Sequence, residues 1–478
     1  MQFNSIEFFF FLPIVLFLYH ILGGVKGLKA QNVFIVLVSY LFYGWWNIKL
    51  LFLIAFTSLL SFLSGVFIKQ LDVKHKSTHH FLTSKKVMIA NVVINLIILG
   101  VFKYYNFFVE NLIELFNIFS IPLNIQTLQL ILPVGISFYT FQALSYTIDV
   151  YKKRIEPTND IVAFFAYVSF FPQLVAGPIE RATNLLPQFL HQRTFSYEKA
   201  VDGMRQMLWG FFMKVVIADN CANVVNTIFR HYTEANWFVL IIGAIFFTFQ
   251  IYGDFAGYSN IAIGCARLFG FDLMENFRTP YLSSNIPEFW RRWHISLNTW
   301  FRDYVYIPLG GNKNGKLQQI RNTFVVFGLS GLWHGANWTY VAWGLYHGGL
   351  TALYKKSEDV YSTVRQILSI IVTFILVVIG WILFRAESIS QAIDYCVRMS
   401  TLQDGLGIGG LELSNIQVVG TFMFITILMC TECLTANKSQ PLVAIAQNRF
   451  IRWSIYILLI LCMLVFPGKS ETFIYFQF

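Results

Sequence analysis

The stretch Gly328-Leu-Ser-Gly-Leu-Trp-His-Gly-Ala-Asn-Trp338 places one histidine in the middle of an apolar run. No Lys, Arg, Asp or Glu occurs between Asn322 and Tyr354. An ionisable side chain in such a run is costly inside a membrane, so His334 is expected to be functional unless a neighbouring helix satisfies it. Glycines flank His334 on both sides and would let a substrate or another backbone approach the ring.

The composition of the whole chain is typical of a membrane protein. Of its 478 residues, 56% are hydrophobic and 13% are charged, whereas soluble domains carry about 25% charged residues. Long apolar runs recur, and no polar stretch is long enough to form a soluble domain. We therefore expect an all-α, polytopic integral membrane protein with a single transmembrane domain over residues 1–478. It should contain about ten or eleven transmembrane helices and some short re-entrant helices.

The cysteines and the net charge exclude several classes of site. The six cysteines lie mostly in or beside apolar runs, and the one C-x-x-C pair, Cys430 and Cys433, has no second pair or nearby histidine. They are expected to be small apolar side chains rather than disulfides or metal ligands. The net charge of +10 comes from basic residues in short loops, where they orient helices, so no nucleic-acid partner is expected.

The charges of the loops predict the orientation of the first spans. Residues 69–86 hold five lysines against one aspartate, and residues 152–154 read Lys-Lys-Arg, so both segments are expected to be cytoplasmic. The connection 108–127 carries two glutamates and no Lys or Arg, as expected of an outer loop. This alternation places the N-terminus outside. The predicted spans are 6–25, 31–47, 50–68, 87–107, 128–150, 235–253, 323–352, 366–384, 415–434 and 452–467.

Three other segments depart from this simple pattern. The broken apolar segment 161–177 is predicted to be a re-entrant element that lines a cavity. The run 200–218 contains Arg205 and Lys214, so its helix is expected to be partly interfacial. Asp254 lies at the end of the predicted span 235–253 and is expected to be a paired structural carboxylate.

The segment 287–303 is the most polar and aromatic candidate helix. It begins Pro287-Glu-Phe-Trp-Arg-Arg-Trp-His-Ile-Ser-Leu-Asn-Thr-Trp300, and proline suits a first helical turn. In one continuous helix His294 and Asn298 would share a face, beside an aromatic stripe. The segment can also be interpreted as an interfacial helix with a tryptophan belt and snorkelling arginines. No belt function requires the imidazole of His294.

His334 is the strongest candidate for catalysis. An imidazole has its unperturbed pKa near neutrality, so it can act as general base for a hydroxyl or thiol. In a continuous helix Asn337 would lie one turn away and could orient the ring. The alternative is a core histidine satisfied by Asn337 or by a carbonyl, which is the expected case for His347. No G-x-S-x-G, P-loop or H-E-x-x-H motif occurs.

Several motifs in a fixed order give the chain a family resemblance. It resembles the membrane-bound O-acyltransferase family, and within it the bacterial branch that O-acetylates alginate and other cell-envelope polysaccharides. The resemblance spans nearly the whole chain, and its motifs are Phe3-Asn-Ser with Phe11-Leu-Pro13, Pro133-Val-Gly-Ile-Ser-Phe-Tyr139, Phe171-Pro-Gln173 with Ala176-Gly-Pro-Ile179, Asp254-Phe-Ala-Gly-Tyr-Ser259, Phe289-Trp-Arg-Arg-Trp-His294, Tyr306-Ile-Pro-Leu-Gly-Gly-Asn312, Leu332-Trp-His-Gly335, Trp381-Ile-Leu-Phe-Arg385 and Phe476-Gln-Phe478.

The resemblance implies many helices around a central tunnel open to both membrane faces, with a catalytic core at about 130–385. It implies that His334 matches the family's catalytic histidine and that His294 matches its second functional position. Acetyl-CoA would be the donor on the cytoplasmic side of the inner membrane, with no further cofactor and no metal. An outer partner resembling SGNH hydrolases would complete transfer to a polysaccharide acceptor, and the other surroundings would be membrane lipid.

Residues near the two histidines are candidates for substrate binding. Asn298, Asn337 or His294 could stabilise an oxyanion or orient His334, and Trp333 would contact substrate beside it. The phosphates of acetyl-CoA need cations, and the nearest candidates in sequence are Arg291, Arg292, Arg302, Lys313 and Lys316. These cations could instead only orient the chain, or pair with Glu288 and Asp303.

Two other functions remain open at this point. The chain could transfer D-alanine to a teichoic acid-type polymer. It could also transport a lipid-linked glycan, for which the supporting feature is only the number of spans. The absence of an internal repeat argues against a transporter.

The charge pattern of the loops gives a testable topology. In variants that keep a single cysteine, Asn117→Cys should react with a membrane-impermeant maleimide added to intact cells, whereas Thr78→Cys should react only after the cells are opened. The physical reason is the lysine excess of 69–86 and its absence from 108–127. Modification of the cysteine at position 78 from outside would contradict the topology.

Overall fold

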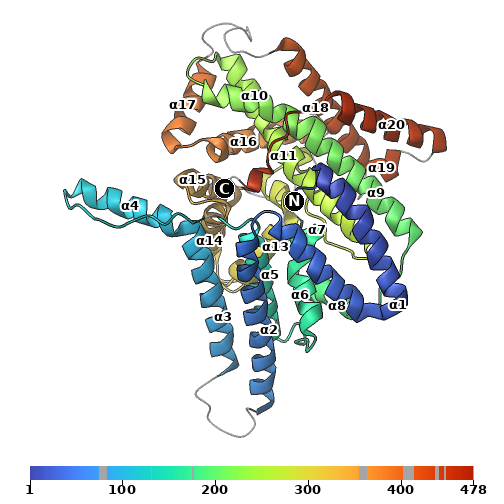
Figure 1. Cartoon of the computed structure of the whole chain (residues 1–478). Coiled ribbons are helices and arrows are strands. Elements are labelled where there is room, and N and C mark those ends of the chain that lie inside the picture. The colour runs from blue at the N-terminus through green and yellow to red at the C-terminus, as the bar shows by residue number, and fades with distance from the viewer. Residues whose placement is uncertain are drawn as a thin grey trace. The chain divides into compact units, whose positions relative to one another are not determined.

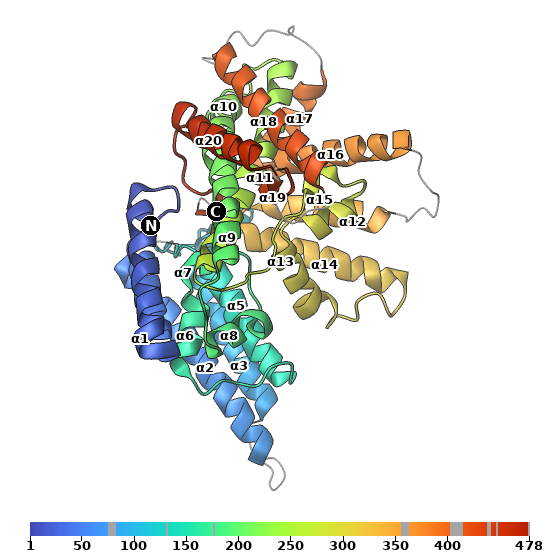
Figure 2. The same ribbon diagram turned by 90° about the vertical axis from the view of Figure 1, so that its right-hand side faces the viewer.

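The computed structural model is built from helices, and Figures 1 and 2 show them in two views. It describes residues 1–74, 83–130, 132–174, 177–354, 363–401, 414–436, 441–445 and 448–476, and no strand occurs in these ranges. The helices form two compact units. One comprises Met1–Gly203 with Ala262–Met274, and the other comprises Met204–Ile261 with Glu275–Phe478. The prediction of a single domain over 1–478 stays a prediction.

The first unit is made from the N-terminal helices. They are α1 (Ile6–Gly44), η1 (Ile48–Leu50), α2 (Leu51–Lys74), α3 (Ser84–Leu99), η2 (Gly100–Tyr104), α4 (Tyr105–Ile118), α5 (Ile136–Tyr151), α6 (Ile161–Ser169), α7 (Phe171–Leu174) and α8 (Ala182–Leu190). Figures 1 and 2 show α2 and α3 as a long pair that lies side by side. The central helix α5 is buried along almost its whole length.

The second unit contains both candidate histidines. Its elements are α9 (Tyr197–Phe212) from Met204 onward, η3 (Met213–Ala218), α10 (Asp219–Arg230), α11 (Trp237–Leu268) up to Ile261, η4 (Pro280–Leu282), α12 (Ile286–Arg292), α13 (Ile295–Phe301), η5 (Arg302–Tyr306), α14 (Lys316–His334), α15 (Trp338–Leu353), α16 (Thr363–Arg385), α17 (Ile389–Ser400), α18 (Asn415–Thr435), α19 (Pro441–Ile445), α20 (Arg449–Val465) and η6 (Ile474–Phe476).

Seven helical segments of the described chain are long and apolar enough to cross a membrane. They are Ile6–Gly24, Ile48–Val73, Ser84–Ile118, Tyr197–Arg230, Trp237–Leu268, Thr363–Arg385 and Asn415–Thr435. A stretch of about 20 apolar residues is what an α-helix needs to span the hydrocarbon core. The prediction of an all-α, multi-pass membrane protein is confirmed. The number of ten or eleven spans stays a prediction.

Residues 6–25 and 31–47 were expected to be separate helices, and the structure confirms a break between them. The helix labelled α1 (Ile6–Gly44) is interrupted at Gly27, whose φ of 74° is readily adopted by glycine. Its second half folds back on the first, since the Phe8 and Phe42 rings lie 6.3 Å apart and Gln31 donates to the Tyr19 carbonyl.

Two other predicted boundaries in the first unit are wrong. Residues 108–127 were expected to be a loop, yet α4 continues to Ile118 after the π-helical turn η2, as Figure 1 shows. The span predicted at 128–150 shortens to α5, which begins after Gly135 with its φ of 72°.

A buried ion pair in the second unit accompanies one further difference. The predicted span 235–253 is the first half of a longer helix, because α11 continues to Leu268. Asp254 does not end it, since this carboxylate forms an ion pair with Lys214 across 2.8 Å, and the prediction of a paired carboxylate is confirmed. The same pairing buries Lys214, which is 1% exposed. The partly interfacial character expected of the helix over 200–218 stays a prediction.

Helices α14 and α15 form the tightest helix pair of the second unit. Gly331 faces the backbone of Tyr340, and Gly344 faces the carbonyl oxygen of Phe327. Glycine at both positions lets the two backbones approach, as small residues do at helix interfaces in membranes. The two helices lie side by side in both views (Figures 1 and 2).

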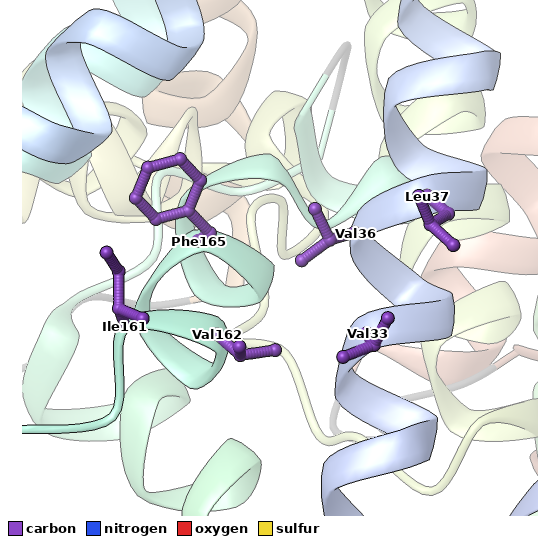
Figure 3. A pocket seen from close by; sticks show the side chains of 6 residues that line it. All are labelled: Val33, Val36, Leu37, Ile161, Val162 and Phe165. Carbon is purple, nitrogen blue, oxygen red and sulfur yellow. The ribbon is translucent and has the colours of Figure 1, made fainter.

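The first unit carries an apolar groove of about 250 Å³ between α1 and α6 (Figure 3). Three of its lining side chains, Val33, Val36 and Leu37, come from α1, and three, Ile161, Val162 and Phe165, come from α6. None of the six has a polar group. The groove therefore cannot supply catalytic chemistry.

The close approach of α14 and α15 predicts a stability effect. In Gly344→Ala the new methyl group would meet the Phe327 carbonyl and the Gly331 Cα, which are backbone atoms that cannot rotate away. We expect a loss of about 1–3 kcal/mol in stability, seen as a lower thermal midpoint of the purified protein in detergent. Gly420→Ala is the control, because nothing lies within 4 Å of that added methyl group. Equal midpoints for both variants would contradict the packing.

Candidate active site

The predicted helix 287–303 is broken at His294. Helix α12 ends at Arg292, α13 begins at Ile295, and His294 between them has φ 44° and ψ 53°. This left-handed conformation costs a non-glycine residue about 1–2 kcal/mol, and such residues are concentrated at functional sites. The expected sharing of one helix face by His294 and Asn298 is therefore wrong.

Distant hydrogen bonds stabilise the break. The backbone oxygen of Asn276 accepts from the Ile295 N–H at 2.9 Å. Asn298 donates its amide hydrogens to the carbonyl oxygens of Trp290 at 2.7 Å and Trp293 at 2.5 Å. These carbonyls are at the end of α12, where no helical N–H can reach them. Asn298 thus supports the turn that presents His294.

The ring of His294 is held in one protonation pattern. Its Nδ1 lies 3.0 Å from Oδ1 of Asn276, an oxygen that also accepts from the Ser296 hydroxyl at 2.8 Å. The Asn276 amide nitrogen donates to Ser259 Oγ at 3.1 Å, so Oδ1 is the acceptor and Nδ1 carries the hydrogen. Nε2 is left with its lone pair and has no hydrogen-bond partner in the described part of the chain. A neutral imidazole with a free Nε2 can accept a proton.

His334 is the last residue of α14, and α15 begins at Trp338. The predicted single span 323–352 is therefore also wrong. Gly335 is extended, and the Asn337 side chain accepts from the Thr339 N–H at 3.0 Å, which begins α15. The Asn337 amide nitrogen donates to the Glu387 carbonyl at 3.1 Å. Asn337 thus caps a helix, which is a common role of asparagine at this position.

Aromatic side chains bring the two histidines into one site. The Trp333 ring centroid lies 6.0 Å from that of His294 and 5.0 Å from that of His334. The Tyr475 centroid lies 6.4 Å from His294 and 5.5 Å from His334. Both imidazoles are buried, at 1% and 2% exposure. The structure therefore groups His294, His334 and Trp333 as the sequence predicted, and it adds Tyr475.

Tyr475 is the site residue that the sequence did not reveal. The aromatic end of the chain was noted only as part of a family motif, and nothing local connects it with either histidine. Its signal was a run of aromatic residues after a polar segment, Phe473-Ile-Tyr475 following Lys469-Ser-Glu-Thr472.

A cavity of about 540 Å³ lies beside this site in the second unit. Helices α12, α13, α14 and α15 line it, and its lining includes the predicted residues Arg291, Asn298 and Arg302. Trp290 also lines it, and the Trp290 ring contacts Trp343, whose centroid lies 5.0 Å from that of His334. A volume of this size suits a small-molecule ligand.

The other predicted cations do not line this cavity. Arg292 forms an ion pair with Glu288 across 2.6 Å, and Lys313 is exposed in the turn before α14. Arg302, by contrast, lines the cavity, and it also pairs with Asp303 across 2.8 Å. Of the predicted cations, only Arg291 and Arg302 therefore lie where a ligand in the cavity could meet them.

A second cavity, of about 410 Å³, is polar. Arg230, Arg385 and Glu387 are among the residues that line it. Phe384, next to Arg385, contacts the His334 ring at 5.5 Å between centroids, and Asn337 bonds to the Glu387 carbonyl. This cavity therefore borders the residues that follow His334, whereas the larger cavity borders the helix that precedes it.

Apolar spanning helices and a buried histidine pair define a multi-pass membrane protein with ionisable side chains in its interior. Comparison with known proteins gives the family. The model of the membrane-bound O-acyltransferase family, MBOAT, matches residues 156–385, which contain both histidines. The chain belongs to this family and is an acyltransferase.

Relatives with curated names agree over most of their length. The "Probable alginate O-acetylase AlgI" of Pseudomonas aeruginosa is 42% identical, over 81% of this chain and 72% of that protein. The protein of the same name from Azotobacter vinelandii is 38% identical, over 92% and 86%. The peptidoglycan O-acetyltransferase of Helicobacter pylori is 31% identical, over 100% and 97%.

The hydrogen bonds of Asn298 predict the effect of an isosteric change. Asn298→Asp replaces two N–H donors by an oxygen that faces the carbonyls of Trp290 and Trp293. Leaving part-buried carbonyls unpaired costs about 1–3 kcal/mol, so the thermal midpoint in detergent should fall. Asn312→Asp, at an exposed amide, is the control. A midpoint unchanged by Asn298→Asp would show that the break does not depend on this side chain.

Proposed function

We propose that this chain takes acetyl groups from cytoplasmic acetyl-CoA and passes them across the inner membrane for O-acetylation of a cell-envelope or exported polysaccharide. The observation that carries the proposal is the burial of His294 and His334 against the same two rings, Trp333 and Tyr475. Relatives named as alginate and peptidoglycan O-acetylating enzymes support the choice of acyl group and acceptor.

His334 is the proposed general base. It would take the proton of the acceptor nucleophile as that group attacks the thioester carbonyl of the donor, and the thiol of CoA would leave with a proton returned to it. An aromatic shell of Trp333, Trp343, Phe384 and Tyr475 surrounds the ring. Water is scarce in such a shell, which strengthens each polar interaction with the reacting groups.

His294 is proposed to assist at the same reaction centre. Asn276 fixes its tautomer so that Nε2 can accept a proton or a hydrogen bond from the acceptor. Asn298 positions His294 through the backbone rather than by touching substrate. Asn337 likewise bonds to the start of α15 and to the Glu387 carbonyl rather than to His334. Its effect on His334 would come through the position of the turn between α14 and α15.

The larger cavity is the proposed donor site. The pantetheine arm of acetyl-CoA is long and uncharged, with apolar groups and two amides, and it suits a cavity lined by both apolar and polar side chains such as Trp290, Phe327 and Thr323. Arg291 and Arg302 are exposed at this cavity, where they could meet the phosphates while those phosphates stay in water. The polar cavity beside Arg385 is the proposed acceptor side, and a tunnel would join the two past His334.

The remaining parts of the proposal follow from the family resemblance and the loop charges. An outer partner of the SGNH-hydrolase-like type would complete transfer to the polymer. The N-terminus would lie outside, with 69–86 and 152–154 in the cytoplasm, although residues 75–82 lie outside the described chain. The re-entrant character of 161–177 stays a prediction, and its described part forms the short buried helices α6 and α7.

Removal of the proposed base gives the main test of function. His334→Ala should lower transfer from labelled acetyl-CoA by about 100- to 10,000-fold, the usual loss for a general base, with near-normal expression and insertion. His191→Ala, at an exposed histidine of the other unit, is the control. Substantial transfer by His334→Ala would end the assignment, and no label transfer by the unaltered protein would favour the D-alanyl or transporter alternatives.

The donor site has a separate kinetic test. Arg291→Ala and Arg302→Ala should raise the KM for acetyl-CoA and leave the KM for the acceptor unchanged, because a phosphate contact exists in ground and transition states alike. Arg292→Ala and Lys313→Ala should have smaller effects, since these side chains lie off the cavity. Arg278→Ala, at an exposed cation paired with Glu275, is the control. An unaltered donor KM in all variants would move the donor site elsewhere.

A further inference from the structure

A buried ion cluster lies in the second unit, and none of its three charged side chains is among the residues that line the two cavities. Lys214, in the π-helical turn η3, is 1% exposed. Its ammonium group lies 2.7 Å from a carboxylate oxygen of Asp219 and 2.8 Å from one of Asp254. Three charges in a membrane interior are costly, and such groups usually mark a function or a required conformation.

The third partner of Lys214 comes from the end of the chain. The ammonium donates to the backbone oxygen of Glu471 at 3.0 Å. The ammonium donates hydrogen bonds to Asp219 and to the Glu471 backbone oxygen, and its contact with Asp254 is an ion pair. Asp254 also binds the tail directly. Its second carboxylate oxygen, which does not face Lys214, accepts from the Ile474 N–H at 2.6 Å. The ion cluster is therefore satisfied only when the chain end lies against it.

Further contacts hold the C-terminal tail, defined here as residues 466–476, on the same turn. The Gly468 N–H donates to the Val215 carbonyl at 3.1 Å, and Asn220 donates to the Phe466 carbonyl at 3.0 Å. Phe473 is fully buried, with its ring 4.5 Å from that of Tyr258. The tail thus returns from α20 to the interior of this unit.

The tail ends at the histidine pair. Tyr475 follows Ile474 directly, and its ring lies 4.5 Å from that of Phe255, 6.4 Å from His294 and 5.5 Å from His334. The hydrogen bond to Asp254 fixes the backbone one residue before this ring. An apolar cluster could hold α9, α10 and α11 together at less cost, but it could not bind the backbone N–H and C=O groups of the tail.

We propose that the Lys214–Asp219–Asp254 cluster anchors the C-terminal tail and thereby positions the Tyr475 ring against both His294 and His334. The three residues are positioning residues that touch no substrate. The inference rests on the proposed function in one respect, because the site that Tyr475 completes is the proposed acyl-transfer site. The anchoring itself can be measured without any activity.

The first measurement is the accessibility of the tail. All six native cysteines are free and would be replaced, and Ile474→Cys would be introduced at a position with 4% exposure. In the native cluster this cysteine should resist a membrane-permeant maleimide. The triple variant Lys214→Met, Asp219→Asn, Asp254→Val removes all three charges together, so no unpaired ion remains. It should raise the labelling rate at least about tenfold, because an exposed tail opens far more often than a packed one.

A second variant perturbs the tail without changing the cluster. A side chain at Gly468 would collide with the backbone of Asp219 and Asn220, so Gly468→Val should also expose the cysteine at position 474. Two matched controls should leave it shielded. Asn260→Ala removes a hydrogen bond from Gln206 that joins α9, the helix before η3, to α11, the helix of Asp254. Gly420→Val adds a side chain where nothing lies close.

The second measurement is kinetic and uses the native Ile474. Both tail-releasing variants should lower kcat by about 10- to 100-fold, the range expected when a catalytic group is misplaced by about 1 Å, with an unchanged KM for acetyl-CoA. The controls should keep both constants. Loss of activity with the cysteine at position 474 still shielded would overturn the proposal, and so would release of the tail with unchanged kcat.

The outcomes also separate this inference from the proposed function. Transfer that survives His334→Ala would overturn the acyl-transfer assignment, while labelling of the cysteine at position 474 in both releasing variants would still support the anchor. Shielding of that cysteine in both variants, together with loss of transfer in His334→Ala, would leave the function standing and overturn the anchor.

Discussion

Lipid offers no hydrogen-bond partner, so each polar group in the interior of a membrane protein must find one in the protein itself. The histidine site depends on this constraint twice. After α12, Asn298 satisfies the freed carbonyls while Asn276 takes the ring of His294. After α14, Asn337 caps the next helix. Asn298 and Asn337 thus bind backbone groups that are left without helical partners where the helices break. Each histidine can therefore lie at the end of a helix rather than within one.

The same constraint explains the charged groups elsewhere in this unit. Lys214 forms ion pairs with two carboxylates and donates a hydrogen bond to a backbone carbonyl of the tail. The tail in turn carries an aromatic ring to both histidines. The segment that accepts the hydrogen bond of Lys214 is thus the same segment that brings Tyr475 to the histidines. This coupling is a physical reason for the chain end to be ordered.

The sequence predicted what depends on local composition. The apolar runs gave the all-α membrane class, and the isolation of His334 among uncharged residues identified the candidate base. The breaks at His294 and Gly335 could not be predicted, because the partners that favour them over a continuous helix, such as Asn276, lie on other segments. Tyr475 was missed for the same reason, since its contacts are with residues far along the chain. Asp254 was recognised as paired, but its partner Lys214 was not.

The arginines at the larger cavity are separated from His334 by aromatic rings, and this separation would suit a charged donor. In sequence, Arg291, Arg292 and Arg302 form one basic group, but in the structure one pairs with Glu288 and two lie exposed at the larger cavity. The rings of Trp290 and Trp343 lie between that cavity and His334. If the donor is acetyl-CoA, its phosphates can stay in water beside the arginines, and only the neutral thioester needs to pass the aromatic layer. The desolvation of a polyanion would then never oppose the reaction, and the imidazoles could work in a site of low polarity.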